Sequence, residues 1–171
     1  MTESIVTPQG IELQYAFSVT IYFKERVRFE PTTPQGGRVY VPVPQGHVDG
    51  PRLKGRVMPY SGADWARSRS DGVAELNAHY MLEADDGTPI YINNRGFLYG
   101  RDENNLPLPY AEWQRRNVGT FAIKPNTYFY LTPVFDAPVG PHDWLTRTVF
   151  LGRGMRKPDP DRTVFDYFGV L

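Results

Sequence analysis

Apolar and polar residues alternate with a period of two along much of the chain, and this pattern predicts β-strands. The clearest stretch is residues 73–84, where Leu76, Ala78, Tyr80 and Leu82 share one parity and polar residues occupy much of the other. The predicted strands span residues 11–28, 38–43, 53–58, 73–84, 89–95, 128–135, 143–151 and 163–170.

Turn-forming residues separate these strands. We expect loops at residues 31–37 and 45–51, a turn at the SGADW sequence (61–65), a hairpin turn at Asp86-Gly87 and another turn at Gly152 to Gly154. Residues 110–117 predict a short helix of about two turns. The sequence therefore predicts an all-β, single-domain antiparallel β-barrel over residues 1–171, with an internal cavity and a loosely ordered N-terminus at 1–9.

The amino-acid composition supports this fold and limits the classes of molecule that the protein is expected to bind. The 171 residues suffice for one domain with a core. The 19 basic and 19 acidic residues balance, which argues against binding to nucleic acid or to an anionic membrane. The 11 Tyr, 10 Phe and 3 Trp exceed what a small core needs. They predict a pocket for a small aromatic or apolar molecule.

The chain has no cysteine, which excludes disulfides, thiolate nucleophiles and cysteine-ligated metals. The three histidines lie on separate segments without a metal-ligand spacing, and there is no phosphate-binding or dinucleotide fingerprint. We therefore expect neither a metal nor a cofactor. The first residues lack a signal-peptide pattern, and we expect a cytoplasmic protein without membrane contact. A homodimer is compatible with this interpretation.

Asp64 and Trp65, in the SGADW sequence, form the first candidate site. Burial beside a large aromatic side chain raises the pKa of a carboxylate, so Asp64 could act as a general acid or base beside a stacking platform. Equally, Asp64 could hydrogen-bond its own turn while Trp65 plugs the barrel end. Asp71 is a weaker catalytic candidate, because Asp before Gly is ordinary turn chemistry; it is retained because it lies near Asp64 in the sequence.

Asn94 and Arg95 form the second candidate site, at the end of a predicted strand. Arg95 could bind a carboxylate, phenolate or enolate, and Asn94 could donate to the same oxygen. The alternative is a structural arginine that pairs with an acidic turn residue. Three aromatic residues, Tyr80, Tyr130 and Trp144, are candidate lining residues of the cavity, although each alone is more simply explained as part of the core.

Several motifs follow one another in a characteristic order: GPRLKG, GADW, DGVAEL, a DGxxIY hairpin, NRG and WLxRTVFxG. In this order the chain resembles the bacterial and fungal family of domains of unknown function numbered 3237. The resemblance implies a compact β-barrel with an internal cavity. Where the family pattern has Asn, this chain has Thr146, which would alter a polar contact near the cavity. Fungal relatives from natural-product gene clusters are similar to cofactor-free enzymes that close or rearrange rings on phenolic polyketides.

Because we expect no thiolate, metal or cofactor chemistry, acid–base catalysis is the mechanism that remains for these residues. We expect a cofactor-independent cyclase, isomerase or lyase of secondary metabolism that acts on a small aromatic or polyketide-like molecule. Asp64 would move the proton, Asn94 and Arg95 would hold the developing oxyanion, and the aromatic candidates would line the cavity. The alternative is a non-catalytic, lipocalin-like binder or carrier of a hydrophobic small molecule, which would return its ligand unchanged.

Overall fold

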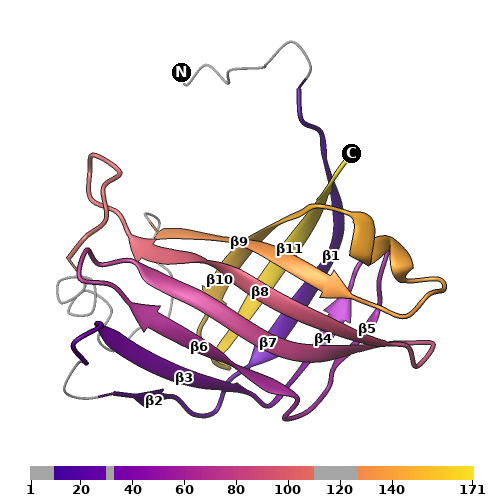
Figure 1. Cartoon of the computed structure of the whole chain (residues 1–171), viewed down its shortest axis with the longest axis horizontal. Coiled ribbons are helices and arrows are strands. Elements are labelled where there is room, and N and C mark those ends of the chain that lie inside the picture. Colours follow the sequence, from indigo (N-terminus) through magenta and orange to yellow (C-terminus); the bar gives the residue numbers. More distant parts are fainter. Residues whose placement is uncertain (1–9, 30–32, 110–126) are drawn as a thin grey trace.

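A computed structural model describes residues 10–29, 33–109 and 127–171 (Figure 1). The predicted loose N-terminus at 1–9 and the predicted helix at 110–117 lie outside the described residues. The elements are β1 (Leu13–Tyr22), β2 (Val27–Arg28), β3 (Gly37–Val43), β4 (Gln45–Asp49), β5 (Gly55–Val57), β6 (Gly62–Ser68), β7 (Ala74–Ala84), β8 (Pro89–Gly100), β9 (Thr127–Asp136), the 3-10 helix η1 (Asp143–Arg147), β10 (Phe150–Lys157) and β11 (Arg162–Val170).

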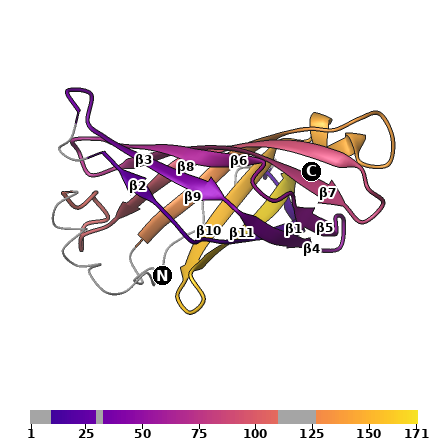
Figure 2. The same ribbon diagram turned by 90° about the horizontal axis from the view of Figure 1, so that it is seen from below.

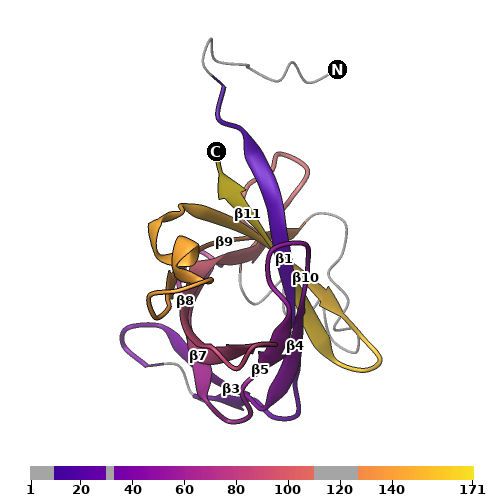
Figure 3. The same cartoon turned by 90° about the vertical axis from the view of Figure 1, so that its right-hand side faces the viewer.

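The strands close into one antiparallel barrel, as the alternation predicts. β7 pairs with β8 along one edge and with β5 along the other. The ring of eight strands therefore runs β7-β8-β9-β10-β11-β1-β4-β5 and back to β7 (Figure 3). Closure pairs each strand of the ring on both sides, so the ring has no open sheet edge.

The remaining strands lengthen the barrel wall. β3 is separated from β4 by Pro44 alone, and β6 follows β5 after residues 58–61. β4 pairs with β1 and β5, whereas β3 pairs with β2 and β6, and β6 pairs with β7. Each of these successive pairs behaves as one bent strand, which gives an up-and-down barrel. Figure 2 shows β2 and β3 toward one end of the barrel and β4 and β5 toward the other.

On β7 and on the first half of β8, the inward-facing side chains are the ones that the sequence pattern predicts. On β7 and β8, Tyr80, Leu82, Ile90 and Ile92 are all fully buried. Aromatic rings fill much of the interior, with edge-to-face contacts between strands far apart in the sequence. The core aromatic residues in contact with one another are Phe17, Phe129, Phe135, Trp144, Phe150, Phe165 and Tyr167.

Gly152 and Gly154 lie within β10, so the prediction of a turn at these residues is wrong. A Cβ atom on Gly152 would lie 2.9 Å from the ring of Tyr167, and one on Gly154 would lie 2.6 Å from the ring of Phe129. The strand needs glycine here because two aromatic rings occupy the space of its inward side chains.

Two further segments predicted as turns or loops are strands. β4 forms where a loop was expected at 45–51, and β6 includes most of the SGADW sequence. Both segments contain glycine at a point of close backbone approach: a Cβ on Gly46 would lie 2.1 Å from the carbonyl oxygen of Thr20. Pairing with neighbouring strands overrides the local turn propensity of these residues.

The strand predicted at 143–151 is also wrong in its first half. Residues Asp143–Arg147 form η1, and β10 begins only at Phe150. Two threonine hydroxyls stabilise this turn, since Thr146 Oγ1 donates to the Asp143 carbonyl and Thr148 Oγ1 to the Trp144 carbonyl, both at 2.8 Å. Within the described residues, no helix is long and apolar enough to cross a membrane.

Replacing Gly87 by alanine is expected to lower the free energy of unfolding by about 1 kcal/mol. Gly87 follows Asp86 in the predicted hairpin turn, with φ of +85° and no atom within 4 Å of a Cβ position. The expected loss of stability therefore comes from the left-handed backbone conformation of alanine at this position, because its Cβ would clash with no other atom. Urea unfolding followed by tryptophan fluorescence measures this loss. Gly87→Asn is the matched control and should lose less, because Asn tolerates the left-handed conformation.

Candidate active site

Asp64 faces the barrel interior from the middle of β6. It lies opposite Val41 of β3 and Ala78 of β7 in the antiparallel register. Directly opposed residues point to the same face of a sheet, and Ala78 has the inward parity of Tyr80. The backbone N–H of Asn77 donates to Asp64 Oδ1 at 2.9 Å. Asp64 therefore projects inward from a strand and does not close its own turn.

The environment of Asp64 makes it a stronger base than an ordinary aspartate. Burial raises the pKa of the Asp64 carboxyl group from 3.8 to about 6, and the N–H of Asn77 offsets part of this rise. The residue keeps some solvent exposure, but protein atoms surround the carboxyl group itself. At pH 7 the carboxylate form predominates, and it accepts a proton more readily than a fully solvated aspartate.

Three buried polar side chains share the barrel interior with Asp64. Tyr80 of β7, Asn94 of β8 and Tyr167 of β11 are each at most 1% exposed. No hydrogen bond of standard geometry reaches Tyr80 Oη, Asn94 Oδ1 or Tyr167 Oη from the described residues, although Tyr80 lies near enough to Tyr167 and Asn94 for weaker hydrogen bonding to affect its pKa. Buried polar atoms without partners are costly, so a cluster of them calls for water or for a polar ligand.

The tyrosines are held in their protonated form. Burial raises the pKa of Tyr80, and the negative charge of Asp64 adds to that rise, while weak hydrogen bonding with the side chains of Tyr167 and Asn94 offsets part of it. Burial also raises the pKa of Tyr167 well above its ordinary value, and Tyr80 contributes. The strand register brings Asp64 and Asn94 to the same level of the wall, because both lie opposite Ala78 of β7, and Tyr80 follows two residues later on that strand. The interior cluster, defined as Asp64, Tyr80, Asn94 and Tyr167, thus combines one base with two neutral O–H donors.

Three predicted residues lie away from the interior cluster. Trp65, Arg95 and Tyr130 are exposed on β6, β8 and β9 and have the outward parity of their strands. Trp65 follows Asp64 directly, so alternation sends the two side chains to opposite faces. The structure therefore does not bring Arg95 to the carboxyl group that it was expected to assist.

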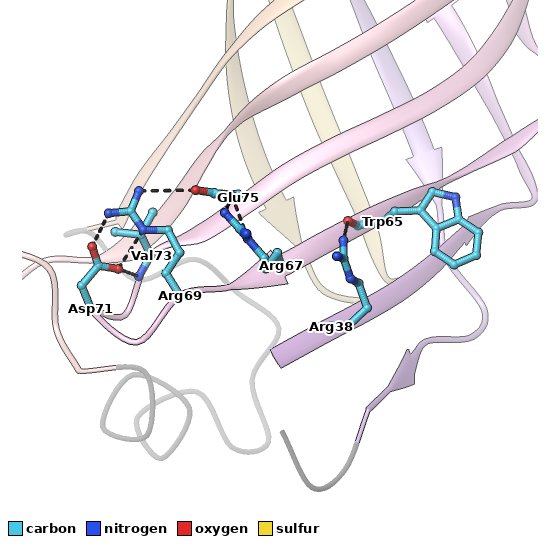
Figure 4. Close-up of polar contacts among 7 residues, drawn as sticks. All are labelled: Arg38, Trp65, Arg67, Arg69, Asp71, Val73 and Glu75. Carbon is cyan, nitrogen blue, oxygen red and sulfur yellow. Dashed lines mark hydrogen bonds and ion pairs between the residues drawn. The ribbon is translucent and has the colours of Figure 1, made fainter. Parts of the chain in front are cut away.

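Asp71 lies in the exposed turn between β6 and β7. It forms an ion pair with Arg69, whose Nε donates to Asp71 Oδ1 at 3.1 Å (Figure 4). It also accepts from the backbone N–H of Val73 at 3.2 Å. The ion pair and the backbone contact account for Asp71 as a turn residue.

Trp144 packs at one end of the aromatic core. Its ring centroid lies 6.5 Å from that of Phe17 and 5.7 Å from that of Phe150, and the guanidinium carbon of Arg52 lies 3.6 Å from the ring centroid. Thr146, two residues later, belongs to η1 and is exposed. A strand over 143–151 would have put these two residues on one face, but both belong to η1, and only Trp144 packs against the core.

A groove of about 760 Å³ lies along the outer faces of β6 to β9 and reaches η1 and β10. We call it the outer groove. Three predicted site residues, Trp65, Arg95 and Thr146, line it together. The structure therefore divides the predicted site into the interior cluster, with Asp64, Tyr80 and Asn94, and the outer groove on the opposite side of the barrel wall.

Metal ligands do not gather in the described part of the chain: no group of three His, Asp or Glu side chains there has an arrangement that could hold an ion. His142 Nε2 contacts Asp86 Oδ2 at 3.0 Å, and His79 contacts Tyr91 and Asn77, so both pair with other side chains. Metal and cofactor independence remains a prediction of the sequence.

Dialysis against EDTA is expected to leave the thermal unfolding midpoint of the purified protein unchanged within about 1 °C, because we expect no bound metal that the chelator could remove. A bound metal would add its binding free energy to the folded state, and its removal would lower the midpoint. Differential scanning calorimetry before and after dialysis measures the midpoint, and elemental analysis measures metal content. Stoichiometric zinc, or a midpoint that falls on chelation and recovers with added metal, would contradict the prediction.

The barrel and its motifs match a known family. A family model described as "Protein of unknown function (DUF3237)" matches residues 11–170. The chain belongs to the DUF3237 family. It is 30% identical over 161 residues to a "UPF0311 protein" of Rhodopseudomonas palustris, which covers 94% of this chain and 97% of that protein.

Two solved structures are similar to this barrel in fold. A β-barrel-like protein from Acinetobacter baumannii is 28% identical, with a TM-score of 0.77 over 96% of this chain and 99% of that chain. An enzyme from Penicillium herquei is 16% identical, with a TM-score of 0.67 over 96% of this chain and 98% of that chain. The fungal likeness shows a shared fold.

Tyr167 is the member of the interior cluster that the sequence analysis missed. The signal was present, because Phe165 and Tyr167 share the buried parity of β11 while Val164, Asp166 and Phe168 point outward. Parity alone places a tyrosine inward but does not show that its hydroxyl group lacks a partner. That information comes only from the side chains packed around it on other strands, such as Phe17 and Phe135.

Proposed function

We propose that this DUF3237 protein is a cofactor-independent enzyme that uses acid–base catalysis within the barrel on a small aromatic or polyketide-like metabolite. The observation that carries this proposal is the inward-facing Asp64 carboxyl group, whose pKa burial raises to about 6, in an interior that also holds two buried tyrosine hydroxyl groups without a hydrogen bond of standard geometry. Strongly perturbed carboxylates next to unpaired polar groups are typical of catalytic sites.

The chemistry would begin with proton transfer to the Asp64 carboxylate, from a phenolic O–H or from a C–H next to a carbonyl group of the substrate. Negative charge would then develop on a substrate oxygen. The O–H of Tyr80 or Tyr167 would donate to that oxygen and stabilise it. Return of the proton from Asp64 to a different atom of the substrate completes an isomerisation. In a cyclisation, the anion instead attacks a carbonyl carbon of the same molecule, the carbonyl π bond becomes an alkoxide, and Asp64 returns its proton to that alkoxide.

The residues in this proposal differ from those expected for the oxyanion. Arg95 projects from the outer face of β8, so the tyrosine hydroxyl groups and Asn94 take its place in the proposed mechanism. Neutral donors suit a buried site, because an unpaired guanidinium there would cost more to desolvate than a hydroxyl group. Aromatic core residues such as Phe135 would orient a flat substrate and exclude water.

The likeness to the Penicillium herquei enzyme supports catalysis as a use of this fold. Fold alone does not fix activity, so the proposal rests on the interior cluster of this chain. The competing function is a lipocalin-like carrier, which the same interior could serve. The two functions differ in one outcome: an enzyme changes the molecule that it binds, whereas a carrier returns it.

Metabolite capture tests the proposal. The purified protein is incubated with an extract of small phenolic metabolites, and bound and free compounds are separated and compared by mass spectrometry. Wild-type protein is expected to deplete a compound and yield a product of equal mass for cyclisation or isomerisation, or of lower mass for cleavage. Asp64→Asn should retain the compound without conversion. Capture without conversion by both proteins would establish the carrier instead.

A further inference from the structure

The outer groove carries positive charge that the acidic side chains of the described residues neutralise only in part. Three arginines and one glutamate line it. Arg67 Nε and Nη2 donate to Glu75 Oε2 at 3.0 and 2.6 Å, so this pair is neutral (Figure 4). Arg38 Nη1 donates to the backbone carbonyl of Trp65 at 3.1 Å, which leaves its charge in place. Arg95 has no acidic partner among the described residues.

Arg95 lies between apolar walls. Its neighbours on the same outer face include Phe97 and Val134, which are 46% and 64% exposed. On the opposite side of the groove lie Val149 and Leu151, at 69% and 41% exposed. Apolar residues that border one concave surface differ from scattered exposed ones, because a ligand can cover them together. The groove volume falls within the range of small-molecule sites.

We infer that the outer groove binds a small amphipathic anion, a molecule with a flat apolar body and one carboxylate. The guanidinium of Arg95 matches the two oxygens of a carboxylate, and Phe97 with Leu151 would cover the apolar body. The net positive charge of the lining favours an anion over a neutral molecule of the same shape. This site is separate from the interior cluster, because Asp64 and Trp65 face opposite sides of the same strand.

A matched pair of probes tests the inference. 2-Naphthoate and 2-naphthamide have the same ring system and differ in charge, and each is titrated by calorimetry and by amide chemical shifts. Naphthoate is expected to bind at least about tenfold more tightly than the amide, because a charge-assisted contact to Arg95 is available only to the carboxylate. The largest shifts should fall at Phe97, Val134 and Leu151. Arg95→Gln should abolish the preference.

Arg153→Gln is the matched control. Arg153 is an exposed arginine on the outer face of β10 that does not line the groove, and this variant should keep the preference for naphthoate. Equal affinities of the two probes for the wild-type protein, or a preference that survives Arg95→Gln, would overturn the inference. Chemical shifts centred on Tyr80 and Asn94 would also overturn the inference, because they would place the probe in the barrel interior. A dimer in sedimentation velocity, together with binding of neither probe, would overturn it as well.

Discussion

Asp64→Asn is expected to lower kcat/KM for the captured substrate by roughly 100- to 10 000-fold, the range typical of removing a general base. Asparagine keeps the shape of the side chain, and its amide oxygen can still accept from the Asn77 N–H that now bonds Asp64 at 2.9 Å. The substitution therefore removes proton transfer and little else. Initial rates at several substrate concentrations measure the loss, and circular dichroism verifies that the barrel remains folded.

The control for this loss is Asp85→Asn, an equivalent substitution in the exposed turn between β7 and β8. It should leave kcat/KM unchanged. Wild-type kcat/KM should rise with pH and level off above about 6, because only the Asp64 carboxylate accepts a proton. A variant with more than half of wild-type activity, or a pH profile without that rise, would show that Asp64 is not the base.

The sequence predicted the parts of the barrel in which local pattern and tertiary pairing agree. In β7, the inward positions Leu76, Ala78, Tyr80 and Leu82 were all correctly assigned, and the Asp86-Gly87 turn joins this strand to β8 as expected. Alternation with one apolar face is a direct consequence of a wall that separates core from solvent. Such strands can be read without knowledge of their neighbours.

The strands that the sequence missed lack that agreement. β6 reads Gly-Ala-Asp-Trp-Ala-Arg-Ser, with a carboxylate inside and a tryptophan outside, which reverses the usual pattern. β4 contains Gly46 where the backbone of β1 approaches closely, and glycine resembles a turn signal when its neighbours are unknown. In both cases, pairing with neighbouring strands determines that the segment is a strand. Because those neighbours are distant in the sequence, the local residue pattern does not predict the pairing.

The sequence predicted part of the candidate site, namely which residue types could take part, but not which side chains face one another. Asp64 and Asn94 were identified by residue type, and the structure places both in the barrel interior. Arg95 was grouped with Asn94 because the two are adjacent, yet adjacency within a strand separates side chains by the full thickness of the wall. An inverted residue such as Asp64 is itself informative, since sequences violate local rules chiefly at functional or strained positions.

The buried carboxylate should also cost the protein stability. The folded-state pKa of Asp64 is about 6, whereas its unfolded value is near 3.8. Between these two pH values the folded protein keeps a proton that the unfolded chain has released. Stability therefore falls as pH rises through this window and stays lower above it. Below both values Asp64 is protonated in either state and contributes nothing to the pH dependence.

Asp64→Asn is therefore expected to stabilise the protein relative to wild type at pH 8 but not at pH 4, with a difference between the two conditions of at most about 3 kcal/mol. Urea unfolding of both proteins from pH 4 to pH 8 measures it, and comparison at each pH cancels the titration of every other shared group. Asp85→Asn should show no such pH-dependent gain. A variant that is less stable than wild type by the same amount throughout would mean that Asp64 is not desolvated in the folded barrel. A gain above pH 6 together with lost turnover would show that the barrel retains a destabilising charge because its chemistry requires one.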